Sequence, residues 1–347
     1  MVRAIGIDPG TKSFDFCGLD DEKIILDISI STKDIIKDPE LISNIIQETK
    51  ADFVVGPSGF GIPITDIKDV GERELFLMSL IKKDDKKSLL GLRTSIKRMQ
   101  YNKLPVFFIP GVIHLSTIPS YRKLNKIDMG TADKLCCTAL GIRDQALKFN
   151  IGYNEISFIL LEMGFGYTAA VAVKNGQIVD GVGGSTGSIG YLSIGGMDSE
   201  LAYLLGGFNK ELVFKGGVEK FARTPEELMD NDNALNAYLE GAIKDVLQLT
   251  ASVDPREILV SGRISRVKGL FEELKSRLDI APIRMIEGLG TKTVKEAAQG
   301  AAIIANGIAG GNYSQLVGTM QIKEAKGTSL DYILLPEIEN IKKDYNI

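Results

Sequence analysis

One order of strands occurs twice in this chain of 347 residues. Residues 2–31 begin with an apolar run that ends at Asp8, turn at once, and continue through two further apolar runs. Residues 156–181 repeat this order, and their first run ends at Glu162. The pattern therefore predicts a hairpin and a third strand at the start of each half. The two acids lie about 150 residues apart, which is the length of one α/β domain.

Helical and strand-like patterns alternate after each of these openings. The longest helices are predicted for residues 131–149, with Thr131 as the N-cap, and for residues 293–308. We expect an α/β protein of two lobes, residues 1–150 and 151–347. From about residue 315 a peripheral strand-and-tail segment is expected.

The turn after Asp8 has the residues that a phosphate site needs. Its Pro-Gly sequence favours a tight turn, and the backbone N–H groups of Gly10, Thr11 and Ser13 would lie free at the tip. Asp8 offers an oxygen ligand to the Mg²⁺ that accompanies a phosphate, and Lys12 adds a cation. Alone, Asp-Pro-Gly is typical of an ordinary turn, and only the recurrence of the hairpin pattern in the second half of the chain favours a phosphate site.

The composition restricts the classes of function. A formal net charge of −4 argues against a nucleic-acid-binding surface. No apolar run reaches about 18 residues, so no membrane span is predicted. Three cysteines are too few for a disulfide framework, and the chain opens on a strand pattern rather than a signal peptide, so we expect a cytoplasmic protein. With one histidine, a multi-histidine zinc site is not expected.

Two α/β lobes that each open with such a hairpin resemble the superfamily of actin, the heat-shock chaperones, and sugar and acetate kinases. The resemblance implies a duplicated actin-like ATPase fold of two ribonuclease-H-like lobes, with ATP and Mg²⁺ in the cleft between them. In this superfamily both hairpins face the phosphates, and a later strand and glycine turn contact the adenosine. The superfamily usually carries Asp in the second hairpin, so the resemblance does not imply direct metal contact by the longer Glu162. The matching positions are Asp8, Gly10, Thr11, Lys12 and Ser13 in the first hairpin, Glu162, Gly164, Gly166 and Thr168 in the second, and Gly262 and Arg263 in the later turn.

Three further residues are candidates for contact with an acceptor. Asp133, at the start of the long helix, resembles the acid of the Gly-x-Asp-Arg motif in type III pantothenate kinases, which is the base for the accepting hydroxyl. A helix N-terminus favours its ionised form, so Asp133 would orient the acceptor or the metal; capping the helix is the simpler alternative. Arg122 could pair with a substrate carboxylate. His114 lies in an apolar run, which favours a buried residue over a group that polarises a phosphoryl oxygen, as in acetate kinases.

Three motifs together resemble an archaeal family predicted to be butyrate kinases: residues 110–115, 128–134 and 183–187. The resemblance implies an ATP- and Mg²⁺-dependent kinase that acts on a small acceptor, a short-chain carboxylate such as butyrate, and yields an acyl phosphate. Two alternatives remain open, a kinase of a small alcohol and a nucleotide-binding regulatory ATPase that transfers no phosphate to a metabolite. The expected partner is a small-molecule substrate, with no nucleic acid and no membrane, and a homodimer is left open.

Overall fold

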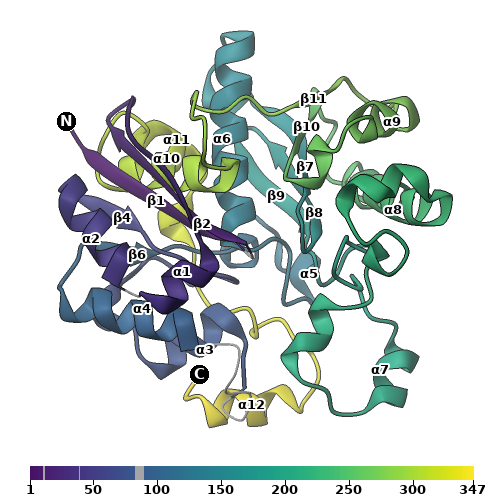
Figure 1. Ribbon diagram of the computed structural model, residues 1–347, viewed down its shortest axis with the longest axis horizontal. Coiled ribbons are helices and arrows are strands. Elements are labelled where there is room, and N and C mark those ends of the chain that lie inside the picture. The colour runs from purple at the N-terminus through teal and green to yellow at the C-terminus, as the bar shows by residue number, and fades with distance from the viewer. Residues whose placement is uncertain (11, 39, 83–89) are drawn as a thin grey trace.

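The computed structural model describes residues 1–10, 12–38, 40–82 and 90–347, and places two β-sheets side by side (Figure 1). The first sheet has the strand order β3-β2-β1-β4-β6-β5. The first three strands are antiparallel, β4 and β6 run parallel to β1, and β5 pairs antiparallel at the edge. Their bounds are β1 Arg3–Pro9, β2 Ser13–Asp20, β3 Lys23–Ser31, β4 Phe53–Val55, β5 Thr65–Asp66 and β6 Val106–Phe108.

The second sheet repeats the topology of the first. Its order is β11-β10-β7-β8-β9, with β7, β8 and β9 antiparallel and β10 and β11 parallel to β7. Asp8 and Glu162 are each the penultimate residue of their first strand, as the repeat predicted. The bounds are β7 Ser157–Met163, β8 Thr168–Lys174, β9 Gln177–Val182, β10 Glu257–Ser261 and β11 Ile283–Met285.

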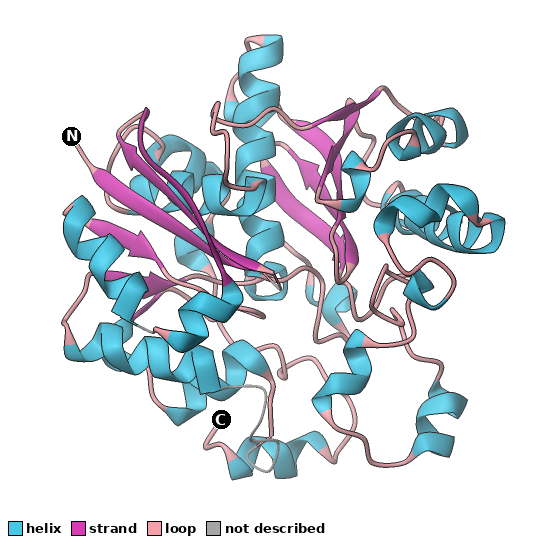
Figure 2. Ribbon diagram, viewed as in Figure 1, coloured by secondary structure: helices cyan, strands magenta, loops and turns pink. Residues whose placement is uncertain are grey.

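Two long helices, α6 (Ala132–Phe149) and α10 (Glu296–Ile308), lie between the sheets (Figure 2). They share one hydrophobic core with the facing sides of both sheets. Glycine permits their close approach: a Cβ on Gly6 of β1 would lie 2.2 Å from the backbone nitrogen of Ala302, and one on Gly300 would lie 1.8 Å from the carbonyl oxygen of Cys136. The central layer therefore requires glycine at both positions.

Further helices cover the outer face of each sheet with separate hydrophobic clusters. Helices α2, α3 and α4 contribute to the cluster on the first sheet, and α8 and α9 to the cluster on the second. The helices outside the central layer are α1 Thr32–Lys37, α2 Glu40–Thr49, α3 Glu72–Ser79, α4 Leu90–Tyr101, α5 Ser120–Lys123, α7 Ser199–Leu205, α8 Asp232–Leu249 and α9 Leu270–Arg277. Short 3₁₀ helices occupy Ile67–Asp69, Val112–His114, Tyr153–Glu155, Lys210–Phe214, Val218–Lys220, Pro225–Asp230, Ile264–Arg266 and Ile322–Glu324.

The C-terminal segment differs from the expected strand and tail. It is helical, with α11 (Ser314–Thr319) and α12 (Ile338–Asp344), and no strand lies in residues 315–347. The apolar side chains of α11 join the central core, whereas those of α12 join the outer cluster of the first sheet, where the Tyr345 ring stacks on Phe76 with 3.5 Å between ring centroids. The end of the chain thus packs on the first lobe. The boundary between residues 150 and 151 remains a prediction.

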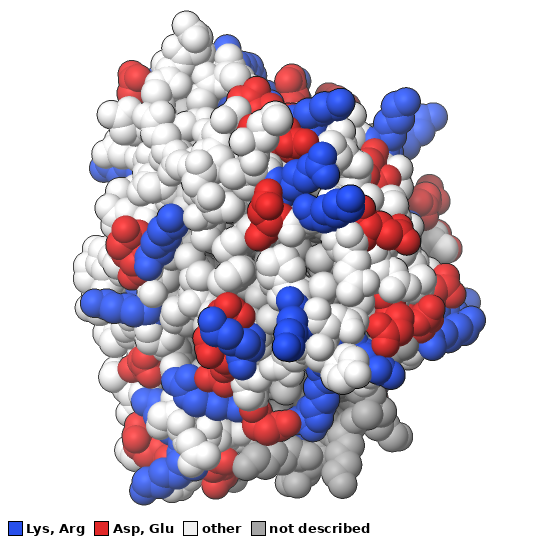
Figure 3. Space-filling view, turned by 90° about the vertical axis from the view of Figure 1, so that its left-hand side faces the viewer, with Lys and Arg blue, Asp and Glu red and all other residues white. Residues whose placement is uncertain are grey.

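Basic and acidic side chains are mixed on the surface shown in Figure 3, and neither sign forms a continuous patch there. No helix in the described part of the chain is long and apolar enough to cross a bilayer.

Candidate active site

Asp8 and Glu162 point toward the same central layer because side chains alternate along a strand. On β1, Ala4 and Gly6 face α10, whereas Ile5 and Ile7 enter the outer cluster, so Asp8 shares the inner face. On β7, Phe158 and Leu160 enter the central core, so Glu162 also faces inward. The repeat therefore brings one acid from each sheet to the middle of the molecule.

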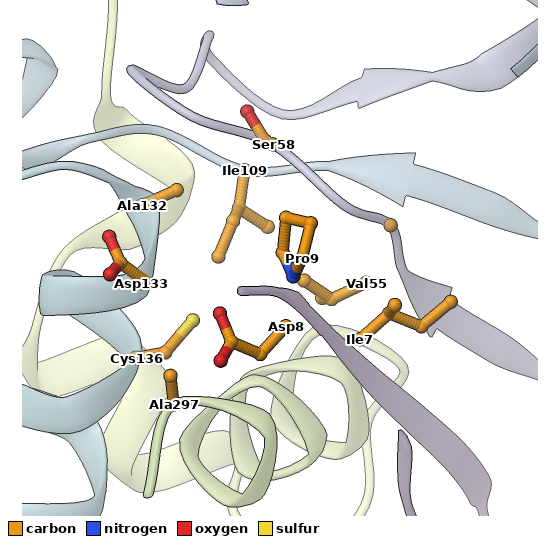
Figure 4. Close-up of a pocket in the computed structure, with 11 residues that line it drawn as sticks. Ile7, Asp8, Pro9, Val55, Ser58, Ile109, Ala132, Asp133, Cys136 and Ala297 are labelled. Carbon is orange, nitrogen blue, oxygen red and sulfur yellow. The ribbon is translucent and has the colours of Figure 1, made fainter. Parts of the chain in front are cut away.

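The N-terminus of α6 supplies a third acid. Asp133 and Asp8 line one cavity of about 10 Å³, which has room for one water molecule or one metal ion. Figure 4 shows the Asp8 carboxyl group directed from β1 toward the start of α6, where Asp133 lies. The other lining residues are mostly apolar: Ile7, Pro9, Val55, Gly56, Ser58, Ile109, Ala132, Cys136 and Ala297.

Lys134 connects Asp133 to Glu162. Its Nζ atom lies 2.5 Å from Asp133 Oδ2 and 3.0 Å from Glu162 Oε2. Thr131 is the N-cap residue of α6, as predicted, but its hydroxyl donates to Asp133 Oδ1 and makes no hydrogen bond to the helix backbone N–H groups. Both Asp133 oxygens are therefore engaged.

The protonation states of this group follow from burial and from Lys134. Burial opposes ionisation of Asp133, but the ammonium and the two hydrogen bonds outweigh it, so the pKa of Asp133 lies below its usual value. For Glu162 the effect of burial is larger than the attraction of Lys134, and repulsion from Asp133 acts in the same direction as burial. The pKa of Glu162 is therefore raised to about 7. Burial disfavours the charged lysine, yet the two carboxylates raise the pKa of Lys134 well above its ordinary value.

A second lysine lies beside Asp8. Lys295, the N-cap residue of α10, places Nζ 2.9 Å from Asp15 Oδ2 and 3.5 Å from Asp8 Oδ2. Burial raises the pKa of Asp8 to about 6, with Asp133 and Asp15 adding to the rise and Lys295 opposing it. A cation bound beside Asp8 would therefore favour the ionised form of its carboxyl group.

Asp128 joins two of the motifs that the sequence analysis identified. Its Oδ1 accepts from the backbone N–H of Gly130 at 2.9 Å, and its Oδ2 accepts from the backbone N–H and the hydroxyl of Ser185 at 3.1 and 3.0 Å. The Thr186 hydroxyl also donates to the Asp128 carbonyl at 2.9 Å. This buried aspartate fixes the loop before α6 against the 183–187 loop.

A larger cavity of about 490 Å³ lies next to the two hairpins, within the size range of small-molecule sites. Lys12 from the first hairpin lies 3.9 Å from the centroid of the Phe165 ring in the second, and the Arg263 guanidinium lies 5.8 Å from the same centroid. This contact links the two halves of the chain at the hairpin tips. The remaining lining residues are Arg223, Thr224, Pro225, Glu226, Arg266 and Val267.

The predicted glycines lie close to these acids. A Cβ on Gly10 would lie 3.8 Å from Asp8 Oδ2, and one on Gly164 would lie 3.0 Å from Glu162 Oε2. Gly262 has φ of +94°, and a Cβ there would lie 2.7 Å from Glu162 Oε1. Gly166 has open space around it.

Other predicted residues have different surroundings. Ser13 donates its hydroxyl to Asp15 Oδ1 at 3.0 Å. Thr168 is buried, its hydroxyl donates to the Tyr238 hydroxyl at 3.3 Å, and it lines neither cavity. Thr11 lies outside the described residues.

The structure does not bring Arg122 to either cavity. Its Nη1 donates to the Val179 carbonyl at 2.7 Å, and its Nε lies 3.6 Å from Asp180 Oδ2. A contact with substrate therefore remains a prediction. His114 is buried, with Nδ1 3.2 Å from the backbone nitrogen of Gly111, and burial lowers the pKa of His114 to about 4. It lines neither cavity.

The donor set fits magnesium. Mg²⁺ is usually held by one or two carboxylates together with water and substrate phosphates, and Asp8 and Asp133 provide two carboxylates on one ion-sized cavity. Within the described ranges, no three His, Cys, Asp or Glu side chains gather as a complete protein-only site. Glu162 does not line this ion-sized cavity, so it is not included among the candidate metal ligands.

Sequence reasoning did not single out Lys134, Lys295, Phe165, Arg223 or Arg266. Phe165 had a signal, because it is the one aromatic residue between the glycines of the second hairpin. No sequence pattern pointed to Lys295, because its approach to Asp8 depends on how α10 packs on β1.

The comparisons with known proteins agree with this architecture. A family model described as "Protein of unknown function (DUF1464)" matches residues 6–335. The chain belongs to this family. A search of the curated proteins gave no match.

The chain is also similar in structure to solved acyl kinases. A propionate kinase from Francisella tularensis subsp. tularensis SCHU S4 has a TM-score of 0.57 at 13% identity, covering 87% of this chain and 98% of that one. Acetate kinases from Entamoeba histolytica and Porphyromonas gingivalis have TM-scores of 0.53 and 0.54 at 12% and 13% identity, each covering 79% of this chain and 86% of theirs. The predicted two-lobed, actin-like ATPase fold is confirmed.

Proposed function

We propose that this protein is an ATP- and Mg²⁺-dependent phosphotransferase whose acceptor is a short-chain carboxylate such as butyrate. One observation supports this most directly: Asp8 of the first hairpin and Asp133 of α6 line a single ion-sized cavity. Such a pair fits a magnesium ion that also holds the phosphates of a nucleotide.

The roles of the residues follow from their positions. Asp8 and Asp133 would hold Mg²⁺, which when bound neutralises charge on the phosphates. The turn at Gly10 to Ser13 and the turn at Gly164 to Thr168 would offer backbone N–H groups to the phosphate chain. The cavity of about 490 Å³ beside Lys12 and Arg263 has the size for the rest of the nucleotide.

The reaction needs little from the protein beyond positioning and charge. An oxygen of the acceptor carboxylate bonds to the γ-phosphorus while the bond from that phosphorus to the β–γ bridging oxygen breaks, giving an acyl phosphate and ADP. Because a carboxylate is already ionised, no proton has to be removed. Oriented donors and cations supply most of the rate enhancement in such transfers.

The state of Asp133 favours a carboxylate acceptor over an alcohol. A general base works best with a pKa near the operating pH, whereas Lys134 and Thr131 hold the pKa of Asp133 below its usual value. The solved structures with TM-scores above 0.5 described above are acetate and propionate kinases, which is consistent with this acceptor class.

A panel of acceptors tests the proposal. The purified chain with Mg²⁺ and ATP is given straight-chain carboxylates from acetate to hexanoate and small alcohols, and ADP release is measured together with trapping of acyl phosphate by hydroxylamine. We expect one or more carboxylates to stimulate ADP release and yield the matching hydroxamate, and a sample with EDTA to yield none. Alcohol-dependent ADP release without hydroxamate would support the alcohol alternative. Slow hydrolysis that no acid or alcohol changes would favour a regulatory ATPase.

A further inference from the structure

Lys295 occupies a fixed position at the tip of the first hairpin. Its backbone N–H donates to Asp15 Oδ2 at 3.2 Å, and its ammonium lies 2.9 Å from the same oxygen. A Cβ on Gly10 would lie 2.9 Å from Lys295 Nζ, so the ammonium adjoins the turn. Lys295 is the N-cap residue of α10, so it is distant from this turn in the sequence.

Asp15 holds the ammonium in place. This carboxylate is 0% exposed, and its Oδ1 accepts from the hydroxyls of Ser13 at 3.0 Å and Ser29 at 2.6 Å. A buried carboxylate with this many partners has one favoured orientation, so the lysine that it binds is oriented as well. Positioning the charge before a ligand arrives reduces the entropy that binding costs.

The same side chain is partly accessible to solvent. The Lys295 side chain is 38% exposed, although its Nζ contacts Asp15 and approaches Asp8 at 3.5 Å. A lysine ammonium has three N–H donors, and these two carboxylates use at most two of them. One donor is left for a ligand at the turn.

We propose that Lys295 is a phosphate-binding residue that contacts the transferring phosphate at the turn of the first hairpin. The inference rests on the proposed function, because it takes the turn at Gly10 as the phosphate site. A fixed cation beside that turn would stabilise the charge of the γ-phosphate during transfer. It would act on the phosphate chain and leave the nucleoside untouched.

Binding without turnover provides the test. Calorimetry measures the affinity of wild type, Lys295→Met and Lys295→Arg for Mg-ATP, inorganic triphosphate and adenosine. The matched control is Lys292→Met, which removes the same charge from the same loop at an exposed position. We expect Lys295→Met to weaken Mg-ATP and triphosphate binding about 10- to 100-fold, the range of a hydrogen bond to a charged group. Lys295→Arg should recover most of the affinity, and Lys292→Met and adenosine binding should match wild type.

A further variant separates contact from folding. Asp15→Asn combined with Lys295→Met removes the lysine and its buried partner charge together, and should lose as much triphosphate affinity as Lys295→Met alone. Unchanged triphosphate binding in Lys295→Met, or an equal loss for adenosine, would overturn the assignment of Lys295. A wild type that binds neither Mg-ATP nor triphosphate would instead overturn the proposed function.

Discussion

The ammonium of Lys134 lies 3.0 Å from the carboxylate of Glu162, and so joins α6 of the first half to β7 of the second. The Glu162 side chain is one methylene longer than that of an aspartate, and its carboxylate is paired with a cation of the protein itself. The acids at the two hairpins differ in their surroundings: Asp8 lines the ion-sized cavity with Asp133, whereas Glu162 contacts a lysine.

Lys134→Met should destabilise the fold. The ammonium compensates two largely buried carboxylates, and removing one partner of such a group costs about 3–5 kcal/mol. Urea denaturation measures the free energy of unfolding, and adding Glu162→Gln should restore part of the loss. Lys148→Met on the same helix is the control, with a cost below about 1 kcal/mol, because Lys148 is half exposed and Glu257 keeps Arg284. Equal losses for Lys134→Met and Lys148→Met would contradict this role.

Stability should fall as the pH rises toward 7. Burial raises the pKa of Glu162 from 4.5 to about 7, so the folded protein holds a proton there that the unfolded chain releases. The folded state is therefore favoured below about pH 4.5, and this advantage is lost as the pH passes 7. Glu162→Gln should show a shallower decline in the free energy of unfolding between pH 5 and pH 8. Parallel profiles for the two proteins would mean that Glu162 titrates normally.

Asp133→Asn should separate the two classes of acceptor. With a carboxylate acceptor no base is needed, so the rate at saturating Mg²⁺ should change by less than about 10-fold. With an alcohol acceptor, loss of the base typically removes 10²–10⁴-fold in rate. Steady-state kinetics at several Mg²⁺ concentrations distinguishes a loss of metal affinity from a loss of kcat. A large fall in kcat at saturating Mg²⁺ would favour the alcohol.

Gly6→Ala should disrupt the central layer. The added methyl group would lie 2.2 Å from the Ala302 nitrogen, so β1 and α10 would have to separate, at a cost of about 1–3 kcal/mol or more. Gly318→Ala in α11 is the control, because nothing lies within 4 Å of its added carbon and alanine favours a helix. Thermal unfolding compares the two. A Gly6→Ala protein as stable as Gly318→Ala would show that the packing can adjust.

The sequence predicted the parts of the fold that local pattern determines. Both hairpins, and α6 beginning at Ala132, follow from apolar runs, turn residues and capping signals within a few positions. Because strand side chains alternate, the inward direction of Asp8 and Glu162 also follows from the pattern.

Long-range contacts were not predictable in this way. Lys295 reaches Asp15 only because α10 packs on β1 at Gly6, which no local signal reports. The C-terminal segment was expected to contain a strand, but its apolar residues are used by helices on the first lobe. Arg122 was predicted to pair with a substrate carboxylate. In the fold its guanidinium donates to the Val179 carbonyl of β9, a long-range contact that the sequence pattern does not report.

The most direct test of the central claim is Mg-ATP-dependent thermal stabilisation in wild type and Asp8→Ala. A ligand that binds only the folded protein raises its melting temperature. We predict that Mg-ATP raises the melting temperature of wild type, that ATP with EDTA has a smaller effect, and that Mg-ATP produces no added rise in Asp8→Ala. Full Mg-ATP stabilisation of Asp8→Ala would contradict the assignment of the first hairpin as the metal and phosphate site.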